Sequence, residues 1–278
     1  MSNELSIGPH IDKVYEKNKN MYENIKSALD YIYDNTGIKF NVISMFVFGP
    51  RSYTETLTEE DKKYIPALNL GIYVHNSYIT PPWKMENKAI KGIVKQLILC
   101  DTIKASGFII HLTKLDVENT ITIMNKLLSE NSFNTRIYLE IPALKPENSI
   151  YHNPSMLNEL FKQGNKQFGI CIDTAHLWSC GVDISDYKSA ELWLSEIEID
   201  PEYLLFHCND NEKNKGQAPD EHSALFEGKI WSKYKDNLTE SGLFTFIKYA
   251  KNNNIPVILE RKPAKLLIND YVNIRQLI

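Results

Sequence analysis

Short apolar runs alternate along the chain with longer segments in which apolar residues recur at helical spacing. The short runs are rich in Val, Ile, Phe and Tyr and predict eight strands, at residues 5–10, 41–48, 69–75, 107–111, 135–141, 168–173, 203–208 and 255–260. The intervening segments predict helices at residues 22–34, 58–67, 85–105, 116–130, 153–163, 186–197 and 239–253. Because a helix between two strands returns the chain to the starting end of the sheet, these strands are expected to run parallel.

The strand segments are apolar at nearly every position, which is typical of strands that are covered on both faces. In a closed barrel, one face lies against the interior and the other against a ring of helices. The 278 residues of the chain also suit one such barrel, for which about 250 residues is typical. We therefore expect residues 1–278 to form a single α/β domain, a (β/α)8 TIM barrel.

Composition and cysteine spacing argue against several classes of protein. No run of about 18 apolar residues without charges exists, and the N-terminal sequence MSNELSIGPH has no basic stretch followed by an apolar one. The cysteines form no C-x-x-C pair, which argues against a disulfide framework or a thiolate zinc site; they are Cys100, Cys171, Cys180 and Cys208. We expect a soluble, intracellular protein that is neither secreted nor bound to a membrane.

Residue types that bind metal ions stand at or near the ends of six of the predicted strands. They are His75, His111, Glu140, Asp173, His207 and Glu260. A barrel gathers the carboxyl ends of its strands at one face, where enzymes of this fold place their chemistry. We therefore expect these six side chains to meet in one cleft.

Each of these residues also has a structural alternative. A single His at a strand end is more often a hydrogen-bonded structural residue than a ligand, and a single acid is often a helix cap, as Asp173 could be in D-T-A-H. The combination favours metal binding, because three carboxylates and three imidazoles without cations carry a like-charge and desolvation cost. Imidazole and carboxylate ligands suit zinc, with manganese or iron as alternatives. Of the other histidines, His152 is expected to be a structural or surface residue. For His10, a structural role and a place in the site both stay open.

Three further residues extend this set. His176 follows Asp173 by three positions and is expected on the same rim of the barrel. Asp220 and His222 form a D-x-H pair, which points both side chains the same way in an extended segment. This pair belongs to residues 209–238, a polar segment that is too long for an ordinary connection and is typical of functional or disordered loops.

The segments that carry these residues form a family pattern. They are IYVHNSY, IIH, YLEIP, CIDTAHLWSCGVD, FHCNDNEKNKGQAPDEHSALFEG and VILE. Their nine candidate ligands span residues 75–260 and stand in the order found in the endonuclease IV family. The sequence therefore resembles this family of AP endonucleases, which have a xylose isomerase-like TIM barrel.

The resemblance implies three zinc ions per chain, with Mn²⁺ or Fe²⁺ as alternatives. The first would be held by His75, His111 and Glu140, the second by Glu140, Asp173, His207 and Glu260, and the third by His176, Asp220 and His222. Glu140, or else Glu260, would orient or deprotonate the attacking water. Arg51, Tyr78 and Ile79 match the positions that enter the minor groove of DNA. For Tyr78, the structural alternative is a partly buried aromatic residue at the rim.

The implied activity is hydrolysis of the phosphodiester bond 5′ to an abasic site in duplex DNA, which leaves a 3′-hydroxyl and a 5′-deoxyribose phosphate in base excision repair. A monomer is expected. The formal net charge of -4 argues against a DNA partner, but three divalent cations would change it to -4 + 6 = +2. Two other functions stay open. One is a metal-dependent sugar isomerase or epimerase of the same barrel family, which needs no third metal, and the other is a nucleic-acid-binding barrel without catalysis.

The sequence departs from the family pattern beside the candidate ligands. Family members commonly have Pro-Gly, Asn-Thr and a basic residue at positions where this chain has Leu112-Thr113, Ile141-Pro142 and Glu221. The ligands are retained, whereas the loops that would hold DNA differ. We therefore expect the family's metal site together with altered contacts to DNA.

Overall fold

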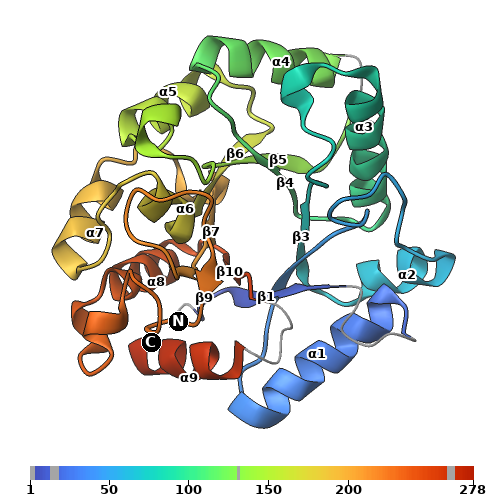
Figure 1. The fold of residues 1–278 in the computed structure, drawn as a ribbon. Helices are drawn as coiled ribbons and strands as arrows, with labels where there is room; N and C mark the ends of the chain where they lie inside the picture. Colours follow the sequence, from blue (N-terminus) through green and yellow to red (C-terminus); the bar gives the residue numbers. More distant parts are fainter. Residues whose placement is uncertain (1–3, 13–18, 130–131, 262–266) are drawn as a thin grey trace.

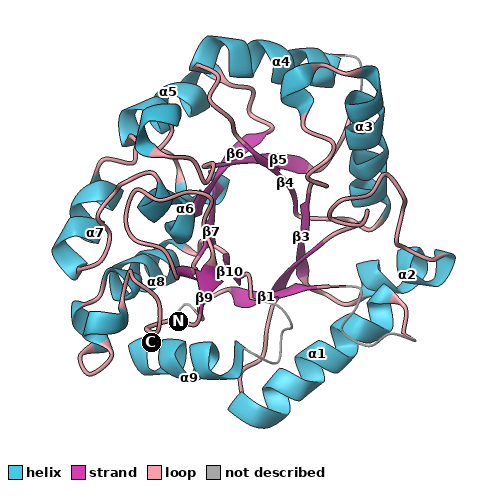
Figure 2. Cartoon of the chain, in the orientation of Figure 1, coloured by secondary structure: helices cyan, strands magenta, loops and turns pink. Residues whose placement is uncertain are grey.

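The computed structural model describes residues 4–12, 19–129, 132–261 and 267–278. Eight parallel strands close into a barrel, and helices surround it (Figure 1, Figure 2). The strands are β1 (Ile7–Ile11), β2 (Val42–Met45), β3 (Gly71–His75), β4 (Gly107–His111), β5 (Arg136–Glu140), β6 (Phe168–Asp173), β7 (Leu204–His207) and β10 (Val257–Leu259). Their order around the barrel is β1-β10-β7-β6-β5-β4-β3-β2. The predicted (β/α)8 barrel is confirmed.

Each predicted helix has a counterpart, most with shifted ends. The α-helices are α1 (Met21–Thr36), α2 (Glu59–Tyr64), α3 (Asn87–Thr102), α4 (Val117–Ser129), α5 (Pro154–Gln163), α6 (Thr174–Ser179), α7 (Tyr187–Ser195), α8 (Gly242–Asn253) and α9 (Ile268–Leu277). The helix predicted at residues 58–67 is α2 followed by a 3-10 turn. The last residue of the helix predicted at 116–130 lies outside the described residues. The sequence pattern missed α6, which has only 6 residues, and α9, which follows the last predicted strand.

A layer of buried side chains fills the interior of the barrel. These are Val42, Tyr73, Ile109, Tyr138, Cys171, Leu205 and Ile258. All except Val42 stand two positions before a candidate metal ligand, as Tyr73 stands before His75. Alternate residues of a strand point to the same side, so the candidate ligands form the next inward layer, at the carboxyl ends of the strands. The barrel is packed below the site, which lies at its mouth.

The long loop at residues 209–238 is ordered around a short hairpin of β8 (Asp210–Asn211) and β9 (His222–Ser223). The buried carboxylate of Asp210 accepts three backbone N–H groups between residues 226 and 230. Gly228 leaves room for this arrangement, because a Cβ there would lie 2.4 Å from Asp210 Oδ1. The predicted loop therefore has a fixed shape, and the hairpin carries the D-x-H pair.

Two expectations of the sequence concern membranes and cysteines. Among the helices of the described residues, none has both the length and the apolar character needed to cross a membrane. All four cysteines are free and buried. Cys171 lies near Glu140 and His207, but burial raises the pKa of its thiol well above the usual value. Cys171 belongs to the layer of side chains that fills the interior of the barrel, so the donor set that we assign consists of imidazoles and carboxylates.

Candidate metal centre

The register of the strands brings candidate ligands side by side. His111 pairs with Glu140 across β4 and β5, and Asp173 pairs with His207 across β6 and β7. Glu260 directly follows β10, the neighbour of β7. All nine candidate ligands meet at this mouth of the barrel, in three groups that share members.

The first group consists of His75, His111 and Glu140. His75 Nε2 lies 3.2 Å from His111 Nε2 and 3.3 Å from Glu140 Oε2. His111 Nε2 lies 2.9 Å from the same carboxylate oxygen. Ligand atoms at about 2.05 Å from a tetrahedral zinc ion lie about 3.3 Å from one another. These three atoms therefore have the spacing of a zinc site.

The second group is built around the other oxygen of Glu140. His207 Nδ1 lies 2.9 Å from Glu140 Oε1, 3.2 Å from Glu260 Oε2 and 3.8 Å from Asp173 Oδ2. Glu140 thus presents one oxygen to each of the first two groups. This is the arrangement that a carboxylate needs in order to bridge two ions.

The third group lies at the hairpin. His222 Nε2 is 2.8 Å from Asp220 Oδ2, and His176 Nε2 is 3.8 Å from the same oxygen. Asp173 Oδ2 also lies 3.8 Å from His222 Nε2, so it faces both the second and the third group. The family resemblance assigned Asp173 to the second zinc position alone. The structure shows that Asp173 also lies close to the third group.

The orientation of three imidazoles is fixed by backbone carbonyls. His75 Nδ1 donates to Asn76 O at 2.9 Å, and His176 Nδ1 donates to Ile141 O at 2.7 Å. His222 Nδ1 donates to a carbonyl oxygen at 3.3 Å. A carbonyl only accepts, so in the neutral form of each ring the proton is on Nδ1 and the lone pair of Nε2 faces the cluster. Such outer contacts commonly orient metal-binding histidines.

Burial and charge in this cluster oppose each other. Burial alone would raise the pKa of Glu140, but His111 and His207 hold it well below its usual value. Burial disfavours a charged His222, yet its contact with Asp220 raises the pKa of this imidazole to about 10. Without a cation, the carboxylates attract protons to the imidazoles. Metal binding supplies the same positive charge and displaces those protons.

One buried atom has the surroundings that a metal ligand needs. Glu140 Oε2 makes no hydrogen bond with the described residues, although His111 Nε2 lies 2.9 Å away. A buried carboxylate oxygen without a hydrogen bond is costly, and a cation that both atoms coordinate would remove this cost. The residues present therefore fit zinc in donor type, in spacing and in tautomer.

Asp173 caps a helix and also faces the cluster, so its position suits both of the roles that its sequence allowed. Its Oδ1 accepts the backbone N–H of His176 at 3.0 Å and caps α6. Its Oδ2 accepts from Asn209 Nδ2 at 2.7 Å and faces His207 and His222. The helix cap and the candidate ligand are two oxygens of one carboxylate.

Sequence reasoning missed Asn209, which connects two candidate ligands. Besides its contact with Asp173, Asn209 accepts the backbone N–H of Glu260 on Oδ1 at 2.9 Å. Its own N–H donates to Thr174 Oγ1 at 2.8 Å. The signal was its place in the quoted motif F-H-C-N-D, two positions after the candidate ligand His207.

The two histidines outside the ligand set differ in position. His10 Nδ1 lies 3.1 Å from Ser44 Oγ and 3.7 Å from Glu260 Oε1, so His10 borders the cluster. His152 lies elsewhere, on the connection before α5, where its carbonyl accepts from Trp193 Nε1. The structural alternative predicted for His152 agrees with this position.

The three candidate DNA-contacting residues lie on two neighbouring loops. Arg51 is exposed, Ile79 is half-buried, and the side chain of Tyr78 is 49% exposed. The ring of Tyr78 packs against His75 and His111, with centroid distances of 5.3 and 5.8 Å. Tyr78 is therefore an aromatic residue at the rim, as its structural alternative states, and still presents an open edge above the first group.

The residues that depart from the family pattern have different surroundings. Leu112 and Ile141 are buried, and the carbonyl of Ile141 is the one that orients His176. Glu221 is exposed. The departure at Ile141 therefore keeps a backbone contact that supports the metal cluster, whereas Glu221 changes the outer surface.

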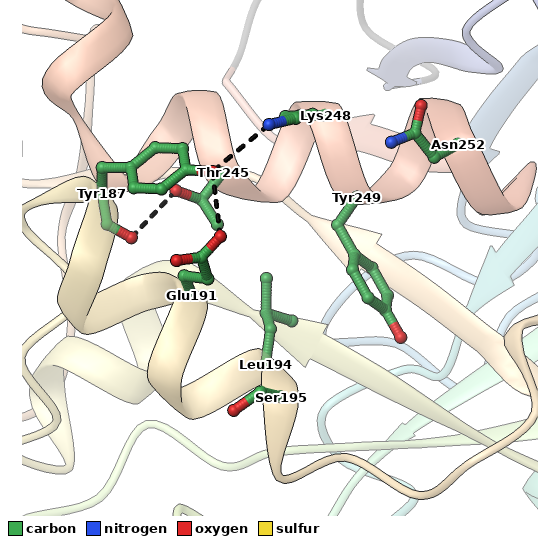
Figure 3. A pocket seen from close by; sticks show the side chains of 8 residues that line it. All are labelled: Tyr187, Glu191, Leu194, Ser195, Thr245, Lys248, Tyr249 and Asn252. Atoms are coloured by element: carbon green, nitrogen blue, oxygen red, sulfur yellow. Dashed lines mark hydrogen bonds between the residues drawn. The ribbon is translucent and has the colours of Figure 1, made fainter.

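A separate pocket lies outside the barrel between α7 and α8 (Figure 3). Three of its polar side chains form a chain of hydrogen bonds. Lys248 Nζ donates to Tyr187 Oη at 3.2 Å, and Tyr187 Oη donates to Glu191 Oε1 at 2.9 Å. No candidate ligand lines this pocket, so it is not part of the metal site.

Comparisons with known proteins agree with this geometry. The family model described as xylose isomerase-like TIM barrel matches residues 36–247. A probable AP endonuclease of African swine fever virus (isolate Tick/Malawi/Lil 20-1/1983) is 34% identical over 242 residues, which cover 82% of this chain and 81% of the viral protein. The crystal structure of AsfvAP:AG has a TM-score of 0.91 at 28% identity and covers 98% of both chains. Endonuclease IV from Thermus thermophilus has a TM-score of 0.74 and covers 98% of this chain and 100% of that one, but at 17% identity it shows the fold alone.

Proposed function

Because this chain belongs to the endonuclease IV family of AP endonucleases, we propose that it is a zinc-dependent enzyme that cuts duplex DNA on the 5′ side of abasic sites. The observation that carries the proposal is the convergence of nine imidazoles and carboxylates at one mouth of the barrel. Phosphodiester hydrolysis needs an activated water and compensation of charge on the phosphate, and a site for several divalent cations provides both. The products are a 3′-hydroxyl and a 5′-deoxyribose phosphate.

We assign the three groups to three zinc ions. The first is held by His75, His111 and Glu140, the second by Glu140, Asp173, His207 and Glu260, and the third by His176, Asp220 and His222. When bound, zinc lowers the pKa of a coordinated water toward about 7 and neutralises phosphate charge. The matched donor types and ligand spacing support this assignment.

The two glutamates have different access to an incoming substrate. The side chain of Glu140 is 0% exposed, and that of Glu260 is 12% exposed. The contact with His207 helps to hold both pKa values well below the usual range, so both are ionised at neutral pH. We assign Glu140 to bridge two ions, and Glu260 to accept a hydrogen bond from the attacking water and orient it toward phosphorus.

Recognition of the lesion is assigned to the rim. Tyr78 and Ile79 would occupy the space of the missing base, and Arg51 would reach the minor groove. An abasic sugar has no stacked base, so turning it toward the metal cluster costs less than turning out an intact nucleotide. One chain supplies every candidate ligand, which supports a monomer that acts wherever the genome is maintained.

A sugar isomerase or epimerase is the main alternative for a barrel of this family. It requires one or two metals, whereas the group of His176, Asp220 and His222 forms a further position. The third group therefore favours the nuclease. A nucleic-acid-binding barrel without catalysis would have no need for nine retained ligands.

The decisive experiment combines metal analysis of the purified protein with a nicking assay. We expect about three zinc ions per chain and one cut 5′ to a single abasic site in a duplex oligonucleotide. An identical duplex without the lesion is the control. Chelation should abolish cutting, and added zinc should restore it. One metal per chain with no cutting would support the isomerase, and tight duplex binding without cutting would support the binding protein.

A further inference from the structure

Three lysines lie on one face of the first half of α3. Lys88, Lys91 and Lys95 are spaced at i, i+3 and i+7, so they fall within an arc of about 60° and extend over about 10 Å of the helix axis. All three are exposed. With Phe48 and Tyr53 they line a groove of about 430 Å³, which we call the α3 lysine groove.

The positive charge of this groove is not compensated by a neighbouring acid. Within residues 4–12, 19–129, 132–261 and 267–278, none of these three ammonium groups has a carboxylate within 4.0 Å. Lys62, by contrast, lies 2.8 Å from Glu55. Lys88 Nζ lies 4.1 Å from the centre of the Tyr53 ring, which is a cation–π contact, and the Lys88 side chain remains exposed.

The groove adjoins the loops assigned to lesion recognition. Tyr53 Oη donates to Ile79 O at 2.9 Å, and Tyr78 N donates to Pro50 O at 2.8 Å. Gly92 lets α3 approach these loops, because a Cβ at Gly92 would lie only 2.6 Å from Thr80 Cγ2. The helix follows β3, whose carboxyl end carries a candidate ligand, so its first turns lie at the mouth of the barrel (Figure 1).

We propose that the α3 lysine groove binds the phosphate backbone of the duplex that flanks the lesion. The proposal rests on the proposed function, and its occupant is duplex DNA. Duplex DNA carries one negative charge per about 1.7 Å of its axis, and a row of three free ammonium groups over about 10 Å complements it. Contacts to phosphate fix the register of a protein on DNA without reading sequence. The groove would therefore hold the duplex while Tyr78 and Ile79 probe it.

The test replaces all three lysines by glutamine, as K88Q/K91Q/K95Q in the zinc-loaded enzyme. Its matched control is K39Q/K126Q/K166Q, which removes the same charge from exposed positions before β2, in the last turn of α4 and before β6. These positions lie toward the opposite end of the barrel. Binding to a fluorescent duplex without a lesion is measured by anisotropy over a range of KCl concentrations. Steady-state kcat and KM are measured on the abasic duplex.

The groove variant should bind the intact duplex about tenfold more weakly, and the slope of log Kobs against log[KCl] should fall in magnitude by up to about 2.7, which is 0.9 for each of three contacts. On the abasic duplex, KM should rise by a similar factor while kcat stays within about twofold. The control variant should retain the slope of the unmodified enzyme. Equal slopes in the two variants would overturn the proposal, because the loss would then come from net charge alone.

The two proposals fail in distinguishable ways. An unmodified enzyme that cuts abasic DNA, with a salt slope that the groove lysines do not change, would overturn the groove alone. A protein that never cuts abasic DNA, yet loses salt-dependent duplex binding only in K88Q/K91Q/K95Q, would overturn the nuclease and keep the groove.

Discussion

Asn209 supports two candidate ligands although its own side chain is not one of them. Its amide nitrogen donates to the carboxylate of Asp173, and its amide oxygen accepts the backbone N–H of Glu260. Only a side chain with both a donor and an acceptor makes this pair of contacts. Residues outside the coordination sphere commonly tune metal sites in this way.

Asn209→Asp should therefore weaken zinc binding while leaving the barrel folded. The substitution replaces a donor with a second carboxylate next to Asp173, and loss of such a partner typically costs about 10- to 100-fold in metal affinity or activity. Zinc titration and the nicking rate measure this effect. Asn158→Asp is a matched control, since the side chain of Asn158 also makes one donor and one acceptor contact, in this case with a backbone carbonyl and a backbone N–H, on α5 away from the cluster. Equal effects of both substitutions would contradict the role of Asn209.

Tyr78→Ala should weaken binding to abasic DNA more than binding to intact duplex. The ring would fill the space of the missing base, and removing a stacked aromatic residue typically costs about 1–3 kcal/mol of binding. We expect about tenfold weaker binding to a non-cleavable abasic duplex and less than about twofold for intact DNA. Tyr31→Ala, at an exposed tyrosine of α1, is the control. The same loss on both duplexes would remove the lesion-probing role.

At the scale of elements, the hairpin of β8 and β9 completes the site from outside the barrel. The sequence predicted the strands well, and β4 and β6 have the predicted bounds, because strands covered on both faces form continuous apolar runs. The hairpin was not predicted. Its two strands have 2 residues each, and its shape comes from contacts of Asp210 with residues 226–230, which no local periodicity reveals.

Gly228→Ala tests the link between this hairpin and the third group. A Cβ at Gly228 would lie 2.2 Å from Ser223 Oγ and 2.4 Å from Asp210 Oδ1, so the hairpin must shift. Overpacking of this kind typically costs about 1–3 kcal/mol of stability. The variant should lose about one zinc per chain, which metal analysis by mass spectrometry would detect. Glu212→Ala, an exposed position in the same loop, should retain all zinc, and full occupancy in both variants would contradict the prediction.

The sequence could predict the part of the candidate site that lies at the ends of the strands. The residues at β3 to β7 and after β10 converge because the barrel requires it, as His75 and Glu260 illustrate. Sequence spacing could not reveal that Asp173 faces two groups, because this depends on which carboxylate oxygen caps α6. Nor could it reveal the α3 lysine groove, which forms only when the loop with Tyr53 folds back on the helix.

At the scale of the whole molecule, the barrel and the metal cluster are separate layers. The interior side chains and the larger core between strands and helices are apolar clusters that contain none of the candidate ligands. Metal removal should therefore abolish activity and make the side chains at the mouth of the barrel more mobile, but the protein should stay folded. A zinc finger differs, because its fold depends on its ion. Circular dichroism of the chelated protein should retain the helical signal of the loaded enzyme, and its loss would show that the ions hold the barrel together.

The pH dependence of zinc binding follows from the same cluster. The contact with Asp220 raises the pKa of His222 to about 10, so without metal this imidazole keeps its proton up to that pH, and zinc must displace it. Zinc affinity should therefore rise with pH between 6 and 8, by about tenfold per pH unit for each proton released. Titration calorimetry in two buffers with different heats of ionisation would count the protons. His152→Ala, at a histidine outside the cluster, should leave the count unchanged, whereas His222→Ala should lower it. An affinity that does not change with pH would mean that the imidazoles are already neutral, and the charge balance described for the cluster would be wrong.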